Sequence, residues 1–207
     1  MSASAQQKLP QLEAQHLTLA EYFEFESKSA TRHEYQNGIV VEMAYASDNH
    51  ELIVANLMRE LGICLKDSDC LVYPSNRMLY VPPCNKTYYP DVSVYCGQRE
   101  TYQYSQNMTA LLNPSVLIEV LSPSTERDDK DKKWRCYKRI PSLKQYILIA
   151  QDEIFVRILS RTEDENKWLQ TEFDLEEESV SIGDCTISLK DIFLNTDIPK
   201  GERSSDV

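Results

Sequence analysis

The 207-residue sequence contains only five glycines and three histidines. It has no Gly-rich phosphate-binding loop and no GxSxG segment, so P-loop nucleotide hydrolases, Rossmann dehydrogenases and serine hydrolases have no motif in this chain. No apolar run is long enough to cross a bilayer. The first sixteen residues lack the apolar stretch that is typical of a secretory signal. We therefore predict a cytoplasmic protein with no membrane partner and no organic cofactor.

The cysteines show none of the spacings that indicate a structural zinc site, since no CxxC pair and no neighbouring HxxxH occurs. They are Cys64, Cys70, Cys84, Cys96, Cys136 and Cys185. Their even number is compatible with three disulfides. Disulfides persist mainly in oxidising compartments, so without a secretory signal we expect reduced and mostly buried thiols.

Positive charge is scarce, because 33 acidic residues face 22 Lys and Arg and the net charge is −11. Affinity for nucleic acid depends largely on neutralising phosphates, so this balance argues against a strong non-specific polyanion binder. The segment 126–139 is an exception, with seven bases and four acids. It indicates either a local phosphate-contacting surface or a solvated amphipathic helix.

Hydrophobic residues make up 42% of the chain, which is typical of a globular domain. We expect one domain at residues 17–194, between a loosely ordered segment at 1–16 and a flexible tail at 195–207. A capping box at Thr18 and Glu21 predicts a short helix. Asn37-Gly38 predicts a hairpin.

Apolar spacing predicts a helix from Asp48 to about Lys66. The run Val116–Leu121 is apolar on both faces apart from one residue, which is typical of a central strand. A helix over 129–139 and a strand over 145–149 follow it, so the two strands should be parallel. Segments 154–160 and 168–173 predict a C-terminal antiparallel pair.

Glu119 is the one charged residue in that central strand. Burying a carboxylate is costly unless it is paired, protonated or bound to a metal. The alternative is that one face of the strand is exposed and Glu119 faces water. The five apolar neighbours favour a functional role.

Asp91 follows a proline and begins another apolar strand. If this strand pairs with the Glu119 strand, the two carboxylates can converge at one edge of the sheet. Two acids and a backbone carbonyl form a hard oxygen environment that suits Mg²⁺ or Mn²⁺. The alternative is a Pro-Asp turn in which Asp91 caps backbone N–H groups.

Lys133 is the candidate cation. Asp129, Lys133 and Tyr137 lie on one face of the helix that follows the Glu119 strand. A lysine there could stabilise charge on a phosphoryl group or orient a water, or it could form an exposed pair with Asp129. Glu34 is a possible third carboxylate, and His50 is a possible proton carrier or substrate contact.

Five segments occur in an order that resembles the Uma-type restriction endonuclease family, a branch of the PD-(D/E)XK nuclease superfamily. They are HEYQNGIVVEM, SDNHELIVANLMREL, YPDVSVY, VLIEVLSPSTERDDKDKKWRCYKRI and LKQYILI. The resemblance covers about residues 17–193. It implies a restriction-endonuclease-like α/β fold: a central mixed β-sheet flanked by helices, with an N-terminal hairpin and C-terminal antiparallel strands.

The resemblance makes Asp91 and Glu119 the acids of the two motifs, which would bind Mg²⁺ or Mn²⁺ together with the Val120 carbonyl. The sequence departs from the superfamily at Leu121, where the motif lysine is expected, and Lys133 matches a lysine that this family places in the next helix. The implied catalytic residues are Asp91, Glu119, Lys133 and Glu34, and the implied substrate-binding residues are His50, Asp129 and Tyr137.

The implied function is a divalent-metal-dependent endonuclease that hydrolyses phosphodiester bonds in DNA. A homodimer is plausible, because two sites are needed to cut both strands at once. The net charge and Leu121 motivate an alternative, a non-catalytic nucleic-acid- or protein-binding module on the same fold. A nuclease that acts on RNA or small nucleotides is a second alternative.

Overall fold

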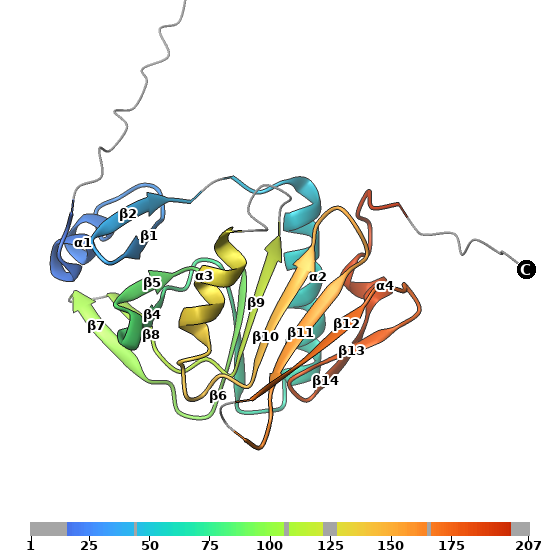
Figure 1. Cartoon of the computed structure of the whole chain (residues 1–207). Coiled ribbons are helices and arrows are strands. Elements are labelled where there is room, and N and C mark those ends of the chain that lie inside the picture. Colours follow the sequence, from blue (N-terminus) through green and yellow to red (C-terminus); the bar gives the residue numbers. More distant parts are fainter. Residues whose placement is uncertain (1–15, 44, 106–107, 122–127, 165–166, 200–207) are drawn as a thin grey trace, which may run out of the picture.

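The computed structural model describes residues 16–43, 45–105, 108–121, 128–164 and 167–199, and for residues 128–131 the backbone alone. Across these residues the chain forms two six-stranded sheets, a two-stranded hairpin and a few helices. Figure 1 shows how these elements are arranged. The mixed α/β class predicted from the sequence is confirmed. The single central sheet of the prediction is accompanied by a second sheet of equal strand number.

The main sheet has the strand order β12-β11-β10-β9-β6-β3. Its strands are β3 (Cys70–Pro74), β6 (Val92–Cys96), β9 (Val116–Leu121), β10 (Gln145–Ala150), β11 (Val156–Arg161) and β12 (Trp168–Phe173). Strands β9 and β10 are parallel, and the other neighbours are antiparallel. The central position of β9 and the C-terminal antiparallel pair are as the sequence predicts.

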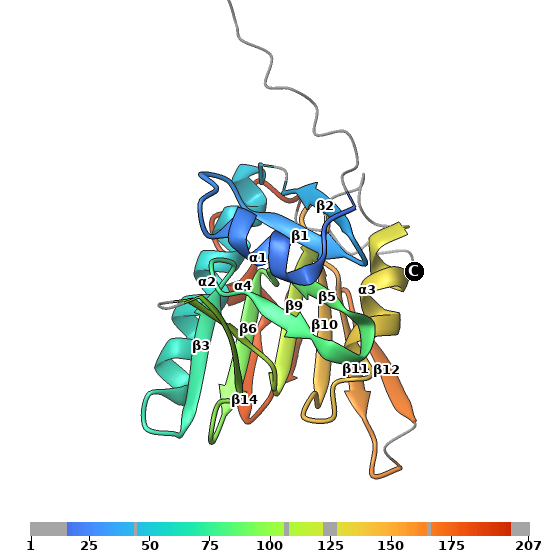
Figure 2. The same ribbon diagram turned by 90° about the vertical axis from the view of Figure 1, so that its left-hand side faces the viewer.

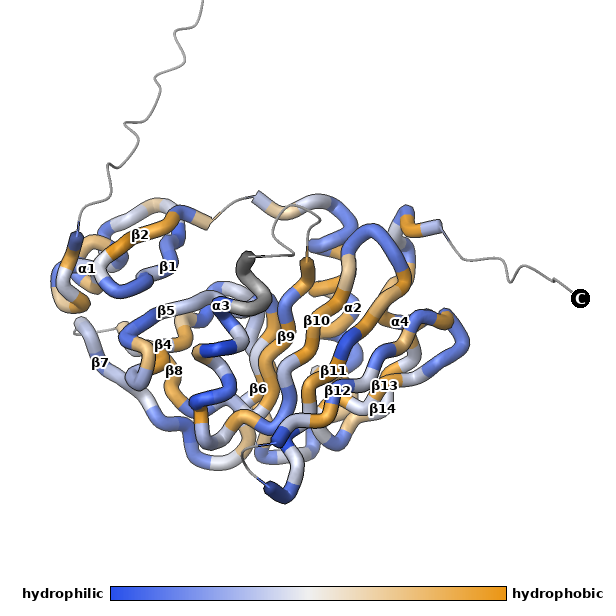
Figure 3. The backbone as a smooth tube through the Cα atoms, viewed as in Figure 1, coloured by the Kyte–Doolittle hydropathy of each residue, from blue (hydrophilic) through white to orange (hydrophobic). Residues whose placement is uncertain are grey.

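Side chains alternate along a strand, so those of β9 point to both faces of the sheet. Both faces are covered. Val116, Ile118 and Val120 pack in the same core as helix α2 (Asp48–Leu65), whereas Leu117 and Leu121 pack with helix α3 (Asp128–Tyr137). Figure 2 shows the two helices on opposite sides of the sheet, and Figure 3 shows the apolar strands between them. By this alternation, position 119 belongs to the α3 face.

The second sheet has the order β2-β1-β5-β4-β8-β7. Its strands are β1 (His33–Gln36), β2 (Ile39–Glu42), β4 (Leu79–Val81), β5 (Lys86–Tyr88), β7 (Thr101–Ser105) and β8 (Met108–Leu111), with the short 3-10 helix η1 (Pro82–Cys84) between β4 and β5. Strands of three to five residues carry little periodicity. The β1–β2 hairpin of this sheet is the part that Asn37-Gly38 predicts.

The N-terminal elements form as the sequence predicts. Helix α1 (Leu19–Glu26) begins at a capping box, in which the Thr18 hydroxyl accepts from the Glu21 N–H and the Glu21 carboxylate accepts from the Thr18 N–H. The β1–β2 turn has positive φ at Asn37 (52°) and Gly38 (99°), which favours these two residue types. This hairpin places β1 directly beside β5.

A C-terminal hairpin and a short helix complete the fold: β13 (Ser179–Ile182), β14 (Cys185–Ser188) and α4 (Leu189–Ile192). The chain stays packed beyond the predicted domain boundary at residue 194, since Ile198 is buried and the Asp197 N–H donates to Asn49. None of the helices in the described ranges is long and apolar enough to cross a membrane.

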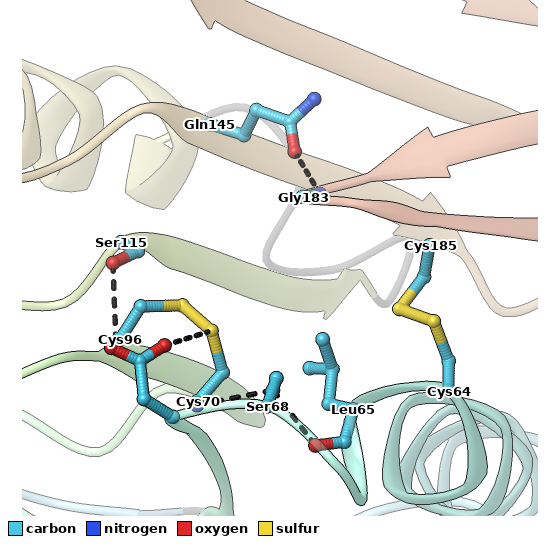
Figure 4. The surroundings of a disulfide bond; sticks show 10 residues. Cys64, Leu65, Ser68, Cys70, Cys96, Ser115, Gln145, Gly183 and Cys185 are labelled. Carbon is cyan, nitrogen blue, oxygen red and sulfur yellow. Dashed lines mark hydrogen bonds between the residues drawn. A yellow bond between two sulfur atoms is a disulfide. The ribbon is translucent and has the colours of Figure 1, made fainter.

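The prediction of reduced thiols was wrong, because the structure pairs all six cysteines. The disulfides are Cys64–Cys185, Cys70–Cys96 and Cys84–Cys136, the first two of which Figure 4 shows. The partners lie 121, 26 and 52 residues apart, so no local spacing reveals them. The fold makes them neighbours: one pair faces across β3 and β6, a second joins α2 to β14, and a third joins η1 to α3.

Candidate active site

A pocket of about 590 Å³ lies where the β1–β2 hairpin, the first turn of α2, the end of β9 and helix α3 meet. Six of the residues that the sequence singled out line it: Glu34, His50, Asp91, Glu119, Val120 and Lys133. They come from segments spread over about a hundred positions of the sequence. The site is therefore a product of the tertiary fold.

Strand pairing brings the two motif carboxylates together. Strands β6 and β9 are antiparallel with Val92 opposite Ile118, so the same register places Asp91 opposite Glu119. Oδ2 of Asp91 accepts a hydrogen bond of 2.8 Å from the Val120 N–H. Both residues are buried, with side chains that are 13% exposed for Asp91 and 7% exposed for Glu119. The expectation that they converge at a strand pair matches this geometry.

Helix α3 supplies the cation that the strand motif lacks. Nζ of Lys133 lies 3.3 Å from both carboxylate oxygens of Glu119 and 3.2 Å from Oε1 of Glu34. The ammonium thus bridges carboxylates from β9 and β1. The alternative of an exposed pair with Asp129 does not describe Lys133, whose side chain is 17% exposed.

Tyr137 lies one helical turn beyond Lys133, and its hydroxyl donates a 2.9 Å hydrogen bond to Oε1 of Glu119. The tyrosine is fully buried and does not line the pocket. Its contact therefore holds the carboxylate from behind, where a substrate has no access. Asp129, another predicted substrate contact, belongs to α3, but its side chain lies outside the described residues.

His50 contacts the other motif acid, with Nε2 3.1 Å from Oδ2 of Asp91. Its backbone N–H donates to Ser47, the N-cap of α2, whose hydroxyl in turn donates to Gln151 at the end of β10. Nδ1 of His50 is buried and has no hydrogen-bond partner among the described residues. The predicted proton carrier or substrate contact is thus fixed beside Asp91.

Burial and crowded charge shift the pKa values of these groups. Burial raises the pKa of Glu119 to about 7; the Lys133 charge opposes this shift, and Asp91 and Glu34 add to it. Burial by itself lowers the pKa of Lys133, but Glu119 and Glu34 outweigh it and hold that pKa well above its usual range. The ammonium therefore stays charged, and Glu119 holds its proton to a higher pH than an ordinary glutamate.

The pKa of His50 is raised by a balance of opposing effects. Burial lowers it, and the hydrogen bond and charge of Asp91 more than reverse the effect. A histidine whose pKa lies above its ordinary value is partly protonated near neutral pH. His50 can therefore supply a proton or a partial positive charge beside Asp91.

The sequence did not reveal three other residues of the pocket wall: Arg32, Tyr146 and Gln151. Tyr146 stands on the same face of the sheet as Glu119, because β9 and β10 are parallel with Leu148 opposite Glu119. The sequence predicted that these two strands are parallel. A predicted pairing register for them would also have identified Tyr146 as a residue of the site. Arg32 lies in a loop and is held by Ser75, which gives no signal in the sequence.

The oxygen-rich wall fits a divalent cation. Five carboxylates line the pocket against two permanent cations, Arg32 and Lys133. In the described part of the chain no three Asp, Glu, His or Cys side chains form a ready-made metal cage. Mg²⁺ commonly uses one or two carboxylates and keeps several waters. Asp91 and Glu119, with the Val120 carbonyl, are such a partial set.

Comparison with known proteins assigns the family. Residues 19–190 match Uma2, a family described as "Putative restriction endonuclease". The chain belongs to the Uma2 family. A crystal structure of a putative nuclease belonging to DUF820 from Anabaena variabilis ATCC 29413 is similar over 86% of this chain and 97% of that one, with a TM-score of 0.67 and 21% identity. The nuclease-like fold of this Uma2 chain is thereby confirmed.

Two curated relatives of this Uma2 chain come from Synechocystis sp. (strain ATCC 27184 / PCC 6803 / Kazusa). Uncharacterized protein sll1609 is 34% identical over 156 residues, which are 75% of this chain and 86% of the relative. Uncharacterized protein slr1290 is 29% identical over 153 residues, 74% of this chain and 78% of the relative. Both matches cover most of the relatives' length.

Proposed function

We propose that this protein is a divalent-metal-dependent endonuclease that hydrolyses phosphodiester bonds in DNA. The observation that carries the proposal is the position of Lys133, whose ammonium lies 3.3 Å from both oxygens of Glu119 in the pocket wall that also holds Asp91. Two acids and a lysine at one sheet edge are the groups that PD-(D/E)XK chemistry requires. Here a helix supplies the lysine, in place of the strand position occupied by Leu121.

Asp91 and Glu119 would hold Mg²⁺ or Mn²⁺ together with the Val120 carbonyl. When bound, such an ion supplies Lewis-acid activation of a water and of the scissile phosphate. The protein prepares for it by fixing one oxygen of Asp91 on the Val120 N–H. The excess of carboxylates in the pocket also repels a bare phosphate, which makes a cation necessary for substrate approach.

Lys133 would stabilise the negative charge that builds up on the phosphoryl oxygens, or orient the attacking water. Its high pKa keeps it protonated, and its contact with Glu34 adds a second carboxylate that fixes the ammonium. Glu34 would therefore act on the phosphate indirectly, by positioning Lys133, or would help to bind a second cation. His50 stands beside Asp91 and could donate a proton to the leaving oxygen.

A homodimer would let two such sites cut both strands of a duplex. Strand β2 is the edge of its sheet and exposes Ile39 and Val41, and Val41 lines the pocket, so a second copy bound along this strand would bring two sites near each other. Sedimentation at micromolar concentration should show a dimer, and the Val41→Lys variant should be a monomer. A wild-type monomer would contradict the dimer but leave the nuclease proposal intact.

The direct test is incubation of the purified protein with supercoiled plasmid in Mg²⁺, Mn²⁺ or EDTA. We expect nicking or linearisation that requires the metal and is lost in Glu119→Gln. Glu24→Gln, which changes an exposed glutamate paired with Lys28, is the matched control and should cleave like the wild type. A parallel assay on an RNA of the same sequence separates the DNA and RNA alternatives.

Full cleavage by a folded Glu119→Gln protein would overturn the assignment of the site. Metal-independent binding of DNA or protein, without cleavage and unaffected by Glu119→Gln, would instead identify the chain as a non-catalytic binding module on the same fold.

A further inference from the structure

Glu26 is a buried carboxylate outside the pocket that the proposed chemistry does not use. It is the last residue of α1, and its side chain is only 3% exposed. Oε1 accepts hydrogen bonds from the Tyr89 hydroxyl at 2.8 Å and the His33 N–H at 3.1 Å, and Oε2 lies 3.0 Å from Nδ1 of His33. A carboxylate buried this deeply is tolerated only when such contacts satisfy it.

The contacts of Glu26 lie next to the point where strands β1 and β5 stop pairing. Strands β1 and β5 pair at Gln36–Lys86 and Tyr35–Thr87, where the described pairing stops. The same register, continued, would place His33 opposite Tyr89. The Glu26 carboxylate contacts both of these residues, so it links the two segments just beyond the described strand pairing.

Two pocket acids lie immediately beside this junction. Glu34 follows His33, and Asp91 comes two residues after Tyr89. Glu34 contacts Lys133, and Asp91 accepts a hydrogen bond from the Val120 N–H. Both acids thus stand within two residues of the positions that Glu26 contacts.

A second layer of hydrogen bonds keeps the junction rigid. The Tyr22 hydroxyl donates to the His33 carbonyl at 2.6 Å, and the Thr87 hydroxyl donates to Tyr22 at 3.0 Å. Tyr22 and Thr87 are fully buried. Helix α1, strand β1 and the β5–β6 connection are thus joined by one polar network that has little freedom to relax.

We propose that Glu26 is a positioning residue of the site: by bridging His33 and Tyr89 it holds the segment that carries the metal-binding acid Asp91 against the strand that carries Glu34, and so fixes the position of Asp91 and the affinity for the divalent cation. This inference rests on the proposed function. Residues that orient metal ligands from behind typically change metal affinity or activity about 10- to 100-fold when they are removed.

The test compares Glu26→Ala, Glu26→Gln and Tyr89→Phe with the wild type in two measurements. One is Mn²⁺ affinity, measured by calorimetry without DNA, and the other is the dependence of plasmid cleavage on Mg²⁺ concentration. We expect Glu26→Ala to weaken Mn²⁺ binding and to raise the half-saturating Mg²⁺ concentration about tenfold or more, with a smaller fall in the rate at saturating metal. Tyr89→Phe should shift both in the same direction.

Glu26→Gln should restore most of the affinity, because its amide oxygen can still accept from Tyr89 and the His33 N–H. Tyr80→Phe is the matched control, since Tyr80 is buried in the same aromatic cluster as Tyr89 and lies outside the Glu26 network. It should leave both metal measurements unchanged.

Unchanged metal dependence in folded Glu26→Ala and Tyr89→Phe, or an equal shift in Tyr80→Phe, would overturn the positioning role and leave the nuclease proposal standing. A wild-type protein that neither binds Mn²⁺ nor cleaves DNA would overturn the proposed function, and this inference with it. Circular dichroism and thermal melts of every variant separate these outcomes from unfolding.

Discussion

Lys133 and Glu119 are 14 positions apart in the sequence, yet the lysine ammonium lies 3.3 Å from both oxygens of the glutamate. The crossover from β9 to α3 creates this contact, because the helix packs back onto the strand from which the chain has just emerged. Leu121 stands two residues after Glu119 and on the same face of β9. Leu121 and Lys133 line the same pocket, so a lysine at position 121 would stand on the same face of the sheet as Glu119.

A lysine placed on strand β9 should restore part of the cleavage activity that is lost when Lys133 is removed. Lys133→Met is expected to lower cleavage about 100-fold or more, which is the effect of removing one charge-stabilising donor. The double variant Leu121→Lys/Lys133→Met should recover part of that loss, measured as the rate of plasmid nicking in Mg²⁺. A double variant as inactive as Lys133→Met would mean that the helix position is essential.

The contribution of Glu119 to the stability of the metal-free protein should fall as the pH rises. The pKa of Glu119 is raised from its ordinary 4.5 to about 7, so its contribution to stability is complete below pH 4.5 and is lost as the pH rises through 7. Glu119→Gln has no such loss. Urea unfolding in EDTA should show the variant gaining about 3 kcal/mol on the wild type between pH 4.5 and pH 8. A difference that does not change with pH would contradict the raised pKa.

Divalent metal should stabilise the wild-type fold. A ligand that binds only the folded state at about 100 times its Kd adds about 2.7 kcal/mol, so thermal melts in Mg²⁺ or Mn²⁺ should shift upward relative to EDTA. Asp91→Asn should abolish the shift. Asp67→Asn, whose parent side chain is 88% exposed, should keep it. An equal shift in both variants would place the metal elsewhere.

Removing the Tyr137 hydroxyl should change the pKa of Glu119 and leave the affinity for DNA unchanged. Its hydrogen bond lowers the pKa of Glu119, so Tyr137→Phe should raise that pKa further and move the pH at which Mn²⁺ binds to higher values. The Kd for DNA in EDTA should remain unchanged, because the tyrosine is fully buried. A large loss of DNA affinity in a folded Tyr137→Phe protein would instead favour the substrate contact that the sequence predicted.

Free-thiol titration of unfolded protein tests the disulfides. Without reductant it should detect no thiol, and after reduction it should detect six. The Cys64→Ser/Cys185→Ser double variant opens the longest loop and should lose about 2–5 kcal/mol of unfolding free energy. Six reactive thiols before reduction would restore the interpretation drawn from the sequence.

The sequence by itself determined the elements with strong local signals. The capping box at Thr18 and the Asn37-Gly38 turn depend on neighbouring residues only, and both formed as predicted. The run Val116–Leu121 required a strand covered on both faces, which made Glu119 conspicuous. The proline before Asp91 and the helical spacing of Lys133 then indicated these two residues as its partners, and the resemblance to a known family implied the same two.

Only the tertiary structure decided how distant segments meet. The second sheet is built from strands too short to show periodicity, and the disulfide partners are up to 121 residues apart. The roles of Glu26 and Tyr89 depend on where β1 and β5 stop pairing. The position of Tyr146 beside Glu119 depends on the parallel register of β9 and β10. Local propensity acts over a few residues, whereas register, burial and the pKa of Glu119 arise from contacts that exist only in the folded chain.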